Sequence, residues 1–270
     1  DIDNNGYPDI LKWRFMSEAQ PDHDCSEYDY EAVCVEDPNC IWEENNCWNN
    51  SEPQFLPHLI LMNDGNSSFS AHDFLPSNAL PFLHSLGLLD ADLDGDLDLL
   101  AIQEEDDDQF MLYLNEGFDD TGAPEFEEVY TFYRSYGDIS SSRIIAISDY
   151  DDDGDQDVYV GRKYGYNWFF ENQTLTGSAG DVTYHSNPEP FFIEKAVPLG
   201  IADSEINEIG SMGYGAAWGD YDNDQDFDLY LANWGVNRLY NNDGNTFTNV
   251  ADVQNVESEE LSNGVSWGDY

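Results

Sequence analysis

The chain has 270 residues, which is long enough for one or two domains with a substantial hydrophobic core. It carries 57 acidic and 8 basic residues, a formal charge of -49, yet its 40% hydrophobic and 14% aromatic content excludes a disordered acidic tail. The electrostatic field of a chain with this charge repels nucleic acid and anionic membrane surfaces. No stretch of the sequence approaches the roughly 18 consecutive apolar residues that are needed to span a bilayer. We therefore expect no nucleic-acid partner and no membrane insertion. Bound cations, an acidic solvated surface, or both can account for the charge.

The first predicted unit begins with an Asp-rich loop, DIDNNGYPD, at residues 1–9. Short apolar runs bounded by turn residues predict strands at residues 10–11, at 59–62 and around Phe69. Between the first two runs lies the segment 22–50, which holds the four cysteines Cys25, Cys34, Cys40 and Cys47. Their even number and clustering predict a small insertion held by two disulfides, and hence an exported protein. A four-cysteine zinc site is the alternative, but the segment has no C-x-x-C pair.

Three further units repeat the loop together with its flanking strands. Each has a run before the loop, the loop, a run after it, a third run and a fourth run centred on phenylalanine. In chain order these are 86–89, 90–98, 97–100, 110–114 and Phe126; then 144–147, 149–157, 158–160, 168–170 and Phe191 with Phe192; then 215–218, 220–228, 229–231, 238–240 and Phe247. A fifth copy starts with the run 265–267 and the loop residue Asp269.

Four short strands in each unit of roughly 50 to 70 residues are typical of a β-propeller blade. We therefore predict an all-β fold, a β-propeller of four-stranded antiparallel blades with a small disulfide-held insertion. Residues 1–270 would form three full blades and parts of one or two more. A β-sandwich also has many short strands, but it does not predict the same loop after every first strand.

The repeated loop has the composition of a calcium site. Oxygen-bearing side chains alternate at positions 1, 3 and 5, a glycine at position 6 permits a sharp turn, the carbonyl of position 7 can face the ion, and an aspartate at position 9 closes the shell. Such an oxygen-only cage suits Ca²⁺ better than Mg²⁺, which retains its waters. We expect about four Ca²⁺ sites, with the ligands Asp1, Asp3, Asn5, Tyr7, Asp9, Asp90, Asp92, Asp94, Asp96, Asp98, Asp149, Asp151, Asp153, Asp155, Asp157, Asp220, Asp222, Asp224, Asp226 and Asp228.

EF-hands share the opening of this pattern, but their loop ends in a glutamate at position 12 and lies between helices. Position 12 here is Lys12, Ala101, Val160 or Leu231, each close to or within a predicted strand, so the sequence excludes EF-hands.

The four loops are not equivalent. Those that start at Asp90 and Asp149 are complete, and we expect them to bind best. Asn5 in the first loop costs one charge but no ligand. Gln225 stands where glycine is expected, so we expect strain and the weakest binding there.

These motifs resemble the FG-GAP or VCBS repeats of integrin-α-type β-propellers. Residues 218–233 and 237–247 are especially similar to the bacterial and cartilage-acidic-protein-like branch. The resemblance covers nearly the whole chain except the cysteine segment. It implies a propeller, commonly of seven blades, with calcium in the hairpin loop between the first two strands of a blade. It also implies a secreted protein that is extracellular or at the cell surface.

Three functions are compatible with this pattern. The first is an adhesive or ligand-binding scaffold with structural calcium and a protein or carbohydrate ligand; the others are a structural subunit of a surface layer or filament, and a calcium-dependent polysaccharide lyase. A lyase needs a base and a cation that neutralises a uronate, but the few basic residues and histidines form no motif, so we expect a scaffold, with no catalytic residues. The Trp-Gly-Asp-Tyr segments at Trp218 and Trp267 are expected in the core. Sequons at Asn49, Asn66 and Asn172 are compatible with export and glycosylation.

The predicted strands leave the outermost units incomplete. The first unit has no strand before its loop, and residues 264–268 form a first strand without companions. Unpaired strand edges are rarely left open. Three arrangements would pair them: ring closure within this chain, further blades in flanking sequence, which the usual blade count of the family favours, or a strand donated by a neighbouring subunit.

Overall fold

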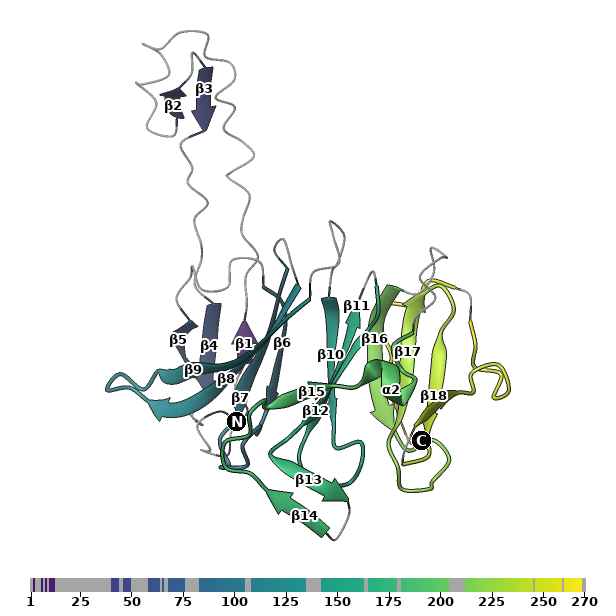
Figure 1. The fold of residues 1–270 in the computed structure, drawn as a ribbon. Coiled ribbons are helices and arrows are strands. Elements are labelled where there is room, and N and C mark those ends of the chain that lie inside the picture. Colours follow the sequence, from purple (N-terminus) through teal and green to yellow (C-terminus); the bar gives the residue numbers. More distant parts are fainter. Residues whose placement is uncertain are drawn as a thin grey trace.

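The computed structural model describes residues 2, 6, 8, 10–12, 40–43, 46–49, 58–63, 65, 68–75, 83–104, 108–134, 142–162, 165–178, 181–203, 212–244, 246–258 and 260–268. Their architecture is all-β. Four antiparallel sheets follow one another in chain order (Figure 1). The prediction of repeated, four-stranded antiparallel units is therefore confirmed for three of them.

Each sheet is a meander in which consecutive strands are hydrogen-bonded neighbours. The first sheet contains β1 (Ile10–Lys12), β4 (His58–Asn63) and β5 (Phe69–Leu75). The second contains β6 (Leu83–Leu89), β7 (Asp98–Glu104), β8 (Asp108–Phe118) and β9 (Pro124–Arg134). The third contains β10 (Ser142–Ser148), β11 (Asp157–Arg162), β12 (Trp168–Asn172) and β15 (Phe192–Glu194). The fourth contains β16 (Met212–Gly219), β17 (Asp228–Trp234), β18 (Arg238–Asn242) and β19 (Phe247–Asn249).

Smaller elements lie outside these sheets. One hairpin, of β2 (Cys40–Glu43) and β3 (Asn46–Asn49), belongs to the predicted cysteine insertion. The sequence did not predict a second hairpin, of β13 (Leu175–Ser178) and β14 (Asp181–Tyr184), or the one-turn helix α2 (Ala196–Leu199). The described part of the chain contains no helix of the length and hydrophobicity needed to cross a bilayer.

Residues 264–268 differ from the prediction. They form no strand; only Leu261, just before them, makes an isolated bridge to Trp234. A strand requires a hydrogen-bonding partner, and the described residues offer none beside this segment. Trp218 packs in the core as expected, whereas Trp267 is 43% exposed.

Hydrophobic side chains fill the space between successive sheets. Phe110 of β8 stacks on Phe170 of β12 with ring centroids 4.1 Å apart, and both are fully buried between the second and third sheets. Tyr159 of β11 and Leu229 of β17 belong to the cluster between the third and fourth sheets. Ile60 of β4 joins the first sheet to the second in the same way. Each of the first three sheets thus buries one face against the sheet that follows it.

The four sheets form an open row, with the first sheet at one end and the fourth at the other (Figure 1). Among the described residues, β1 is paired only with β4. Ring closure within this chain is therefore not observed.

Candidate metal centres

The predicted loops lie at the same place in each of three sheets, between the first strand and the second. Three carboxylates in each loop have oxygen atoms within 4.8 Å of one another. These groups are Asp90, Asp92 and Asp94 in the second sheet, Asp149, Asp151 and Asp157 in the third, and Asp220, Asp222 and Asp228 in the fourth. The chain therefore concentrates negative charge at three equivalent points.

A left-handed backbone produces the sharp turn of each loop. The φ angles at position 6 are 98° at Gly95, 106° at Gly154 and 84° at Gln225. Gln225 therefore adopts the conformation that we expected of a glycine. Position 4 is also left-handed in all three loops, which the sequence did not indicate: the φ angles are 62° at Leu93, 55° at Asp152 and 60° at Asn223.

The aspartate at position 9 connects each loop to the third strand of its sheet. Asp98 is 1% exposed; its Oδ2 accepts from Ala91 N at 2.7 Å and its Oδ1 from Asn115 N at 2.9 Å. The same two bonds recur in the other loops, from Tyr150 N and Asn172 N to Asp157, and from Tyr221 N and Asn242 N to Asp228. This buried carboxylate therefore fixes the loop to the sheet.

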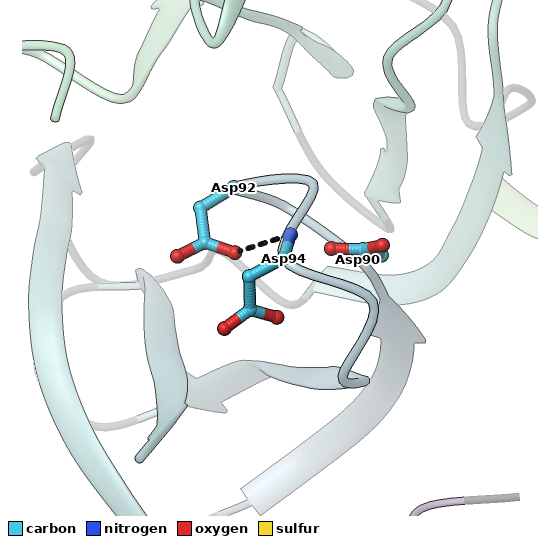
Figure 2. A group of neighbouring side chains, drawn as sticks. All are labelled: Asp90, Asp92 and Asp94. Carbon is cyan, nitrogen blue, oxygen red and sulfur yellow. Dashed lines mark hydrogen bonds between the residues drawn. The ribbon is translucent and has the colours of Figure 1, made fainter. Parts of the chain in front are cut away.

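Figure 2 shows Asp90, Asp92 and Asp94 around one turn of the second-sheet loop. Asp92 Oδ1 accepts from Asp94 N at 3.2 Å, and Asp90 Oδ2 accepts from Gly95 N at 3.1 Å. The other oxygen of Asp90, Oδ1, is buried and has no hydrogen-bond partner. A buried carboxylate oxygen without a donor is costly, and a cation would satisfy it.

The third-sheet loop is the most enclosed. Asp153 and Asp155 are 8% and 1% exposed. Asp155 Oδ2 accepts from Leu175 N at 2.6 Å, whereas its Oδ1 is buried without a partner. Leu175 belongs to β13, and on the paired strand β14 the Tyr184 O–H donates to Asp92 O at 3.2 Å. The β13–β14 hairpin thus contacts the loops of both the second and the third sheet.

The fourth-sheet loop is more open, because Asp222 and Asp224 are exposed. Asp220 accepts from Asp224 N and Gln225 N, both at 3.1 Å, and Asn241 Nδ2 donates to Asp222 Oδ2 at 3.0 Å. All three loops bring carboxylates together, and our ranking of the Gln225 loop as the weakest stays a prediction.

Burial raises the pKa of several carboxylates in these loops, and neighbouring carboxylates raise it further. The pKa reaches about 7 for Asp98 and Asp151, about 8 for Asp155 and about 6 for Asp228. The pKa of Asp157 also lies well above its ordinary value, chiefly because the group is buried. A cation beside these groups would favour their ionised forms near neutral pH.

The residues present fit a hard divalent cation. The clustered groups are carboxylates, with no sulfur or imidazole among them, and two of the loops contain a buried carboxylate oxygen without a donor. Oxygen-only donor sets of high charge are those of Ca²⁺ sites.

Several predicted residues fall outside the described part. These are the ligands Asp1, Asp3, Asn5, Tyr7 and Asp9, the cysteines Cys25 and Cys34, and the sequon residue Asn66. The backbones of Cys40, Cys47 and Asn49 are placed, in the β2–β3 hairpin, where Cys40 lies opposite Asn49 and Cys47 opposite Trp42.

The sequon at Asn172 coincides with a buried structural residue. Asn172 is 0% exposed, and its side-chain nitrogen, to which a glycan would be attached, donates to Ala91 O at 3.0 Å. A glycan is incompatible with this packing, so we do not propose glycosylation at Asn172.

The sequence did not indicate the role of an asparagine at the end of the third strand. Asn172 in the third sheet bonds Ala91 O in the second-sheet loop, and Asn242 in the fourth sheet bonds Tyr150 O in the third-sheet loop at 2.8 Å. In both cases the acceptor is the carbonyl of loop position 2. An asparagine after each third apolar run was the available signal, but sequence alone does not show which sheet it contacts.

The chain matches no protein-family model, and no curated protein is similar to it. The resemblance to FG-GAP or VCBS repeats therefore stays a prediction.

Proposed function

We propose that the chain is an extracellular calcium-binding scaffold of the FG-GAP or VCBS propeller type. Calcium ions would fix the loops of successive blades, and the rigid surface would bind a protein or carbohydrate ligand. The observation that carries this proposal is the recurrence of a group of three neighbouring carboxylates, always including loop positions 1 and 3, at the same strand junction in three successive sheets. A solvated acidic turn has no reason to recur in this way, with its ninth residue buried each time.

The position of the loops favours a structural role for the metal. Asp98, Asp157 and Asp228 each connect a loop to the third strand of its own sheet. A cation that neutralises such a cluster stabilises the junction between strands, because it removes carboxylate repulsion. An ion bound by the native loops and hardly by the unfolded chain stabilises the fold by linkage.

Metal removal tests this proposal. We expect the melting temperature to be higher in millimolar Ca²⁺ than in EGTA, because a site whose ligand is at 100 times its Kd adds about 2.7 kcal/mol. Calorimetry and elemental analysis should show that Asp92→Ala and Asp151→Ala each lose one ion. Asp252→Ala, which removes an exposed carboxylate outside the loops, should lose none. Identical melting temperatures in calcium and EGTA would contradict the proposal.

A further inference from the structure

The interface between the third and fourth sheets differs from the interface before it. Between the second and third sheets, Trp168 and Phe170 of β12 are fully buried against Phe132 of β9, and their ring centroids lie 5.4 Å and 5.2 Å from that of Phe132. The corresponding residues of β18 in the fourth sheet are Arg238 and Tyr240, which have the same register with the second strand. An arginine thus occupies a position that holds a core aromatic side chain in the preceding sheet.

The shorter fourth strand of the third sheet leaves space at this interface. In the second sheet β9 extends to Arg134, so that Phe132 covers Trp168. In the third sheet β15 ends at Glu194, and the chain continues instead into the one-turn helix α2 (Figure 1). A cavity of about 620 Å³ lies between this part of the chain and β18. Its volume is within the range of about 300–1,000 Å³ that is usual for small-ligand pockets.

The lining of this cavity combines charged, amide and aromatic side chains. Its polar and aromatic members are Tyr166, Asp203, Arg238, Tyr240, Asn249 and Glu257. They come from the third sheet, from the fourth sheet and from the segments that follow β15 and β19, so only the folded chain brings them together. The cavity is therefore a feature of one particular junction between sheets.

Arg238 is held in place by carboxylates on two sides. Its side chain is 9% exposed; Nε donates to Asp203 Oδ1 at 3.4 Å, and Nη1 lies 3.8 Å from Glu257 Oε1. Asp203 is fixed in turn, because its Oδ2 accepts from Asn233 Nδ2 at 3.3 Å. Its φ angle of 44° is left-handed, which is unfavourable for a residue with a Cβ. Buried ion pairs are often no more stabilising than apolar side chains of similar volume, so stability alone does not explain this arrangement.

The charges of the cavity disfavour ionic ligands. Asp203 and Glu257, together with the chain's charge of -49, repel an anion such as a uronate. Arg238 repels a cation. A neutral polyhydroxylated ligand avoids both penalties, because each hydroxyl can donate to a carboxylate and accept from the guanidinium group. Tyr166 and Tyr240, which line the same cavity, offer apolar ring surface to the C–H groups of a sugar.

We propose that this cavity binds a neutral oligosaccharide. Arg238 donates to sugar hydroxyls, and Asp203 and Glu257 accept from them. The inference rests on the proposed function, since it locates the ligand site of the scaffold and selects carbohydrate over protein. Arg238 and Asn242 lie at opposite ends of β18, and Asn242 is the residue that contacts the carboxylate loops. The site therefore uses none of the loop carboxylates.

An array of immobilised oligosaccharides tests the ligand class. The 270-residue chain, in saturating calcium, is applied to neutral, sialylated, sulfated and uronate-containing oligosaccharides, and calorimetry measures its Kd for the best neutral ligand. We expect binding to neutral oligosaccharides and none to the acidic ones, because the negative charge of the chain repels them. Binding to no neutral oligosaccharide, stronger binding to acidic ones, or displacement by the cationic peptide trilysine would overturn the proposal.

Two pairs of variants locate the site. Glu257→Ala should weaken binding about tenfold, the loss expected for a hydrogen bond to a charged group, whereas Glu260→Ala, at an exposed position outside the cavity, should not. Val197→Trp narrows the cavity from α2, where the side chain is 58% exposed, and should also weaken binding. Val182→Trp, at an exposed position on β14, is its control. Undiminished binding in either cavity variant, or an equal loss in its control, would overturn the proposal.

Melting curves of the same samples separate this inference from the proposed function. A chain that calcium stabilises but that binds no neutral oligosaccharide overturns the inference alone. A chain that binds a neutral oligosaccharide without being stabilised by calcium overturns only the role of the metal.

Discussion

Gln225 occupies position 6 of the fourth-sheet loop, where the other two described loops have glycine. Its φ angle of 84° lies in the left-handed region, which is unfavourable for a residue with a Cβ, whereas Gly95 and Gly154 hold the same position without that cost. The local turn is nevertheless formed, because Asp220 accepts from Gln225 N and Asp224 N. The fold therefore imposes this conformation on an unfavourable residue.

We expect Gln225→Gly to stabilise the chain by about 1 kcal/mol, because it relieves the left-handed strain. Gln156 is a matched control, since it lies in the equivalent loop of the third sheet but has no positive φ angle. Gln156→Gly should destabilise the chain by about 0.5–1 kcal/mol. Urea denaturation of both variants measures the difference, and a stabilising effect of both, or of neither, would contradict the explanation.

Each loop combines a carboxylate cluster and a buried aspartate at position 9 with a hydrogen-bonded turn. The pKa values of Asp98, Asp151, Asp155 and Asp228 are raised to between about 6 and 8, mainly by burial. The metal-free folded loop consequently binds more protons than the unfolded chain between about pH 4 and pH 8. Stability must then fall as pH rises through this window.

We expect the metal-free protein in EGTA to melt at a higher temperature at pH 5 than at pH 8. Saturating calcium should reduce or reverse this dependence, since the cation holds the carboxylates ionised and its binding releases protons. Melting curves at both pH values, with and without calcium, measure the effect. A metal-free protein that becomes more stable from pH 5 to pH 8 would show that these loops do not govern its pH dependence.

The sequence predicted the repeated strands because each is a short apolar run beside a recognisable loop. The β13–β14 hairpin was missed because it occurs in only one repeat, and its contacts with Asp155 and Asp92 depend on a neighbouring sheet. The strand predicted at residues 264–268 did not form. A strand needs a neighbouring strand to hydrogen-bond with, and the sequence of a segment does not show whether one is present. The burial of Asn172 was unpredictable for the same reason: its acceptor, Ala91 O, is 81 residues away.

Apolar faces and a few hydrogen bonds join the successive sheets. Asn242 Nδ2 donates to Tyr150 O at 2.8 Å. This bond links the third and fourth sheets, whose apolar cluster includes Tyr159 and Leu229. Asn242 is 1% exposed, so the loss of its amide leaves the buried carbonyl of Tyr150 and the part-buried N–H of Gly244 without these partners.

We expect Asn242→Ala to destabilise the protein by about 2 kcal/mol, because buried hydrogen-bonding groups lose their partners. Hydrogen exchange should accelerate in β17 and β18 of the fourth sheet and in the loop at Tyr150, and less in the first sheet. Asn187→Ala, at an exposed position, is the control and should have little effect. Uniform acceleration over all four sheets would argue against a local link.

The bonds from Asn172 and Asn242 also give the row of sheets a direction. Each reaches backward, from the third strand of one sheet to the second residue of the preceding sheet's loop, so a loop is completed only when its successor has docked. A loop folded before its successor would hold an ion with a less rigid backbone. Metal affinity would then increase one loop at a time along the chain, in the order in which synthesis supplies the sheets. The number of tightly bound ions would then increase with the number of sheets that have folded.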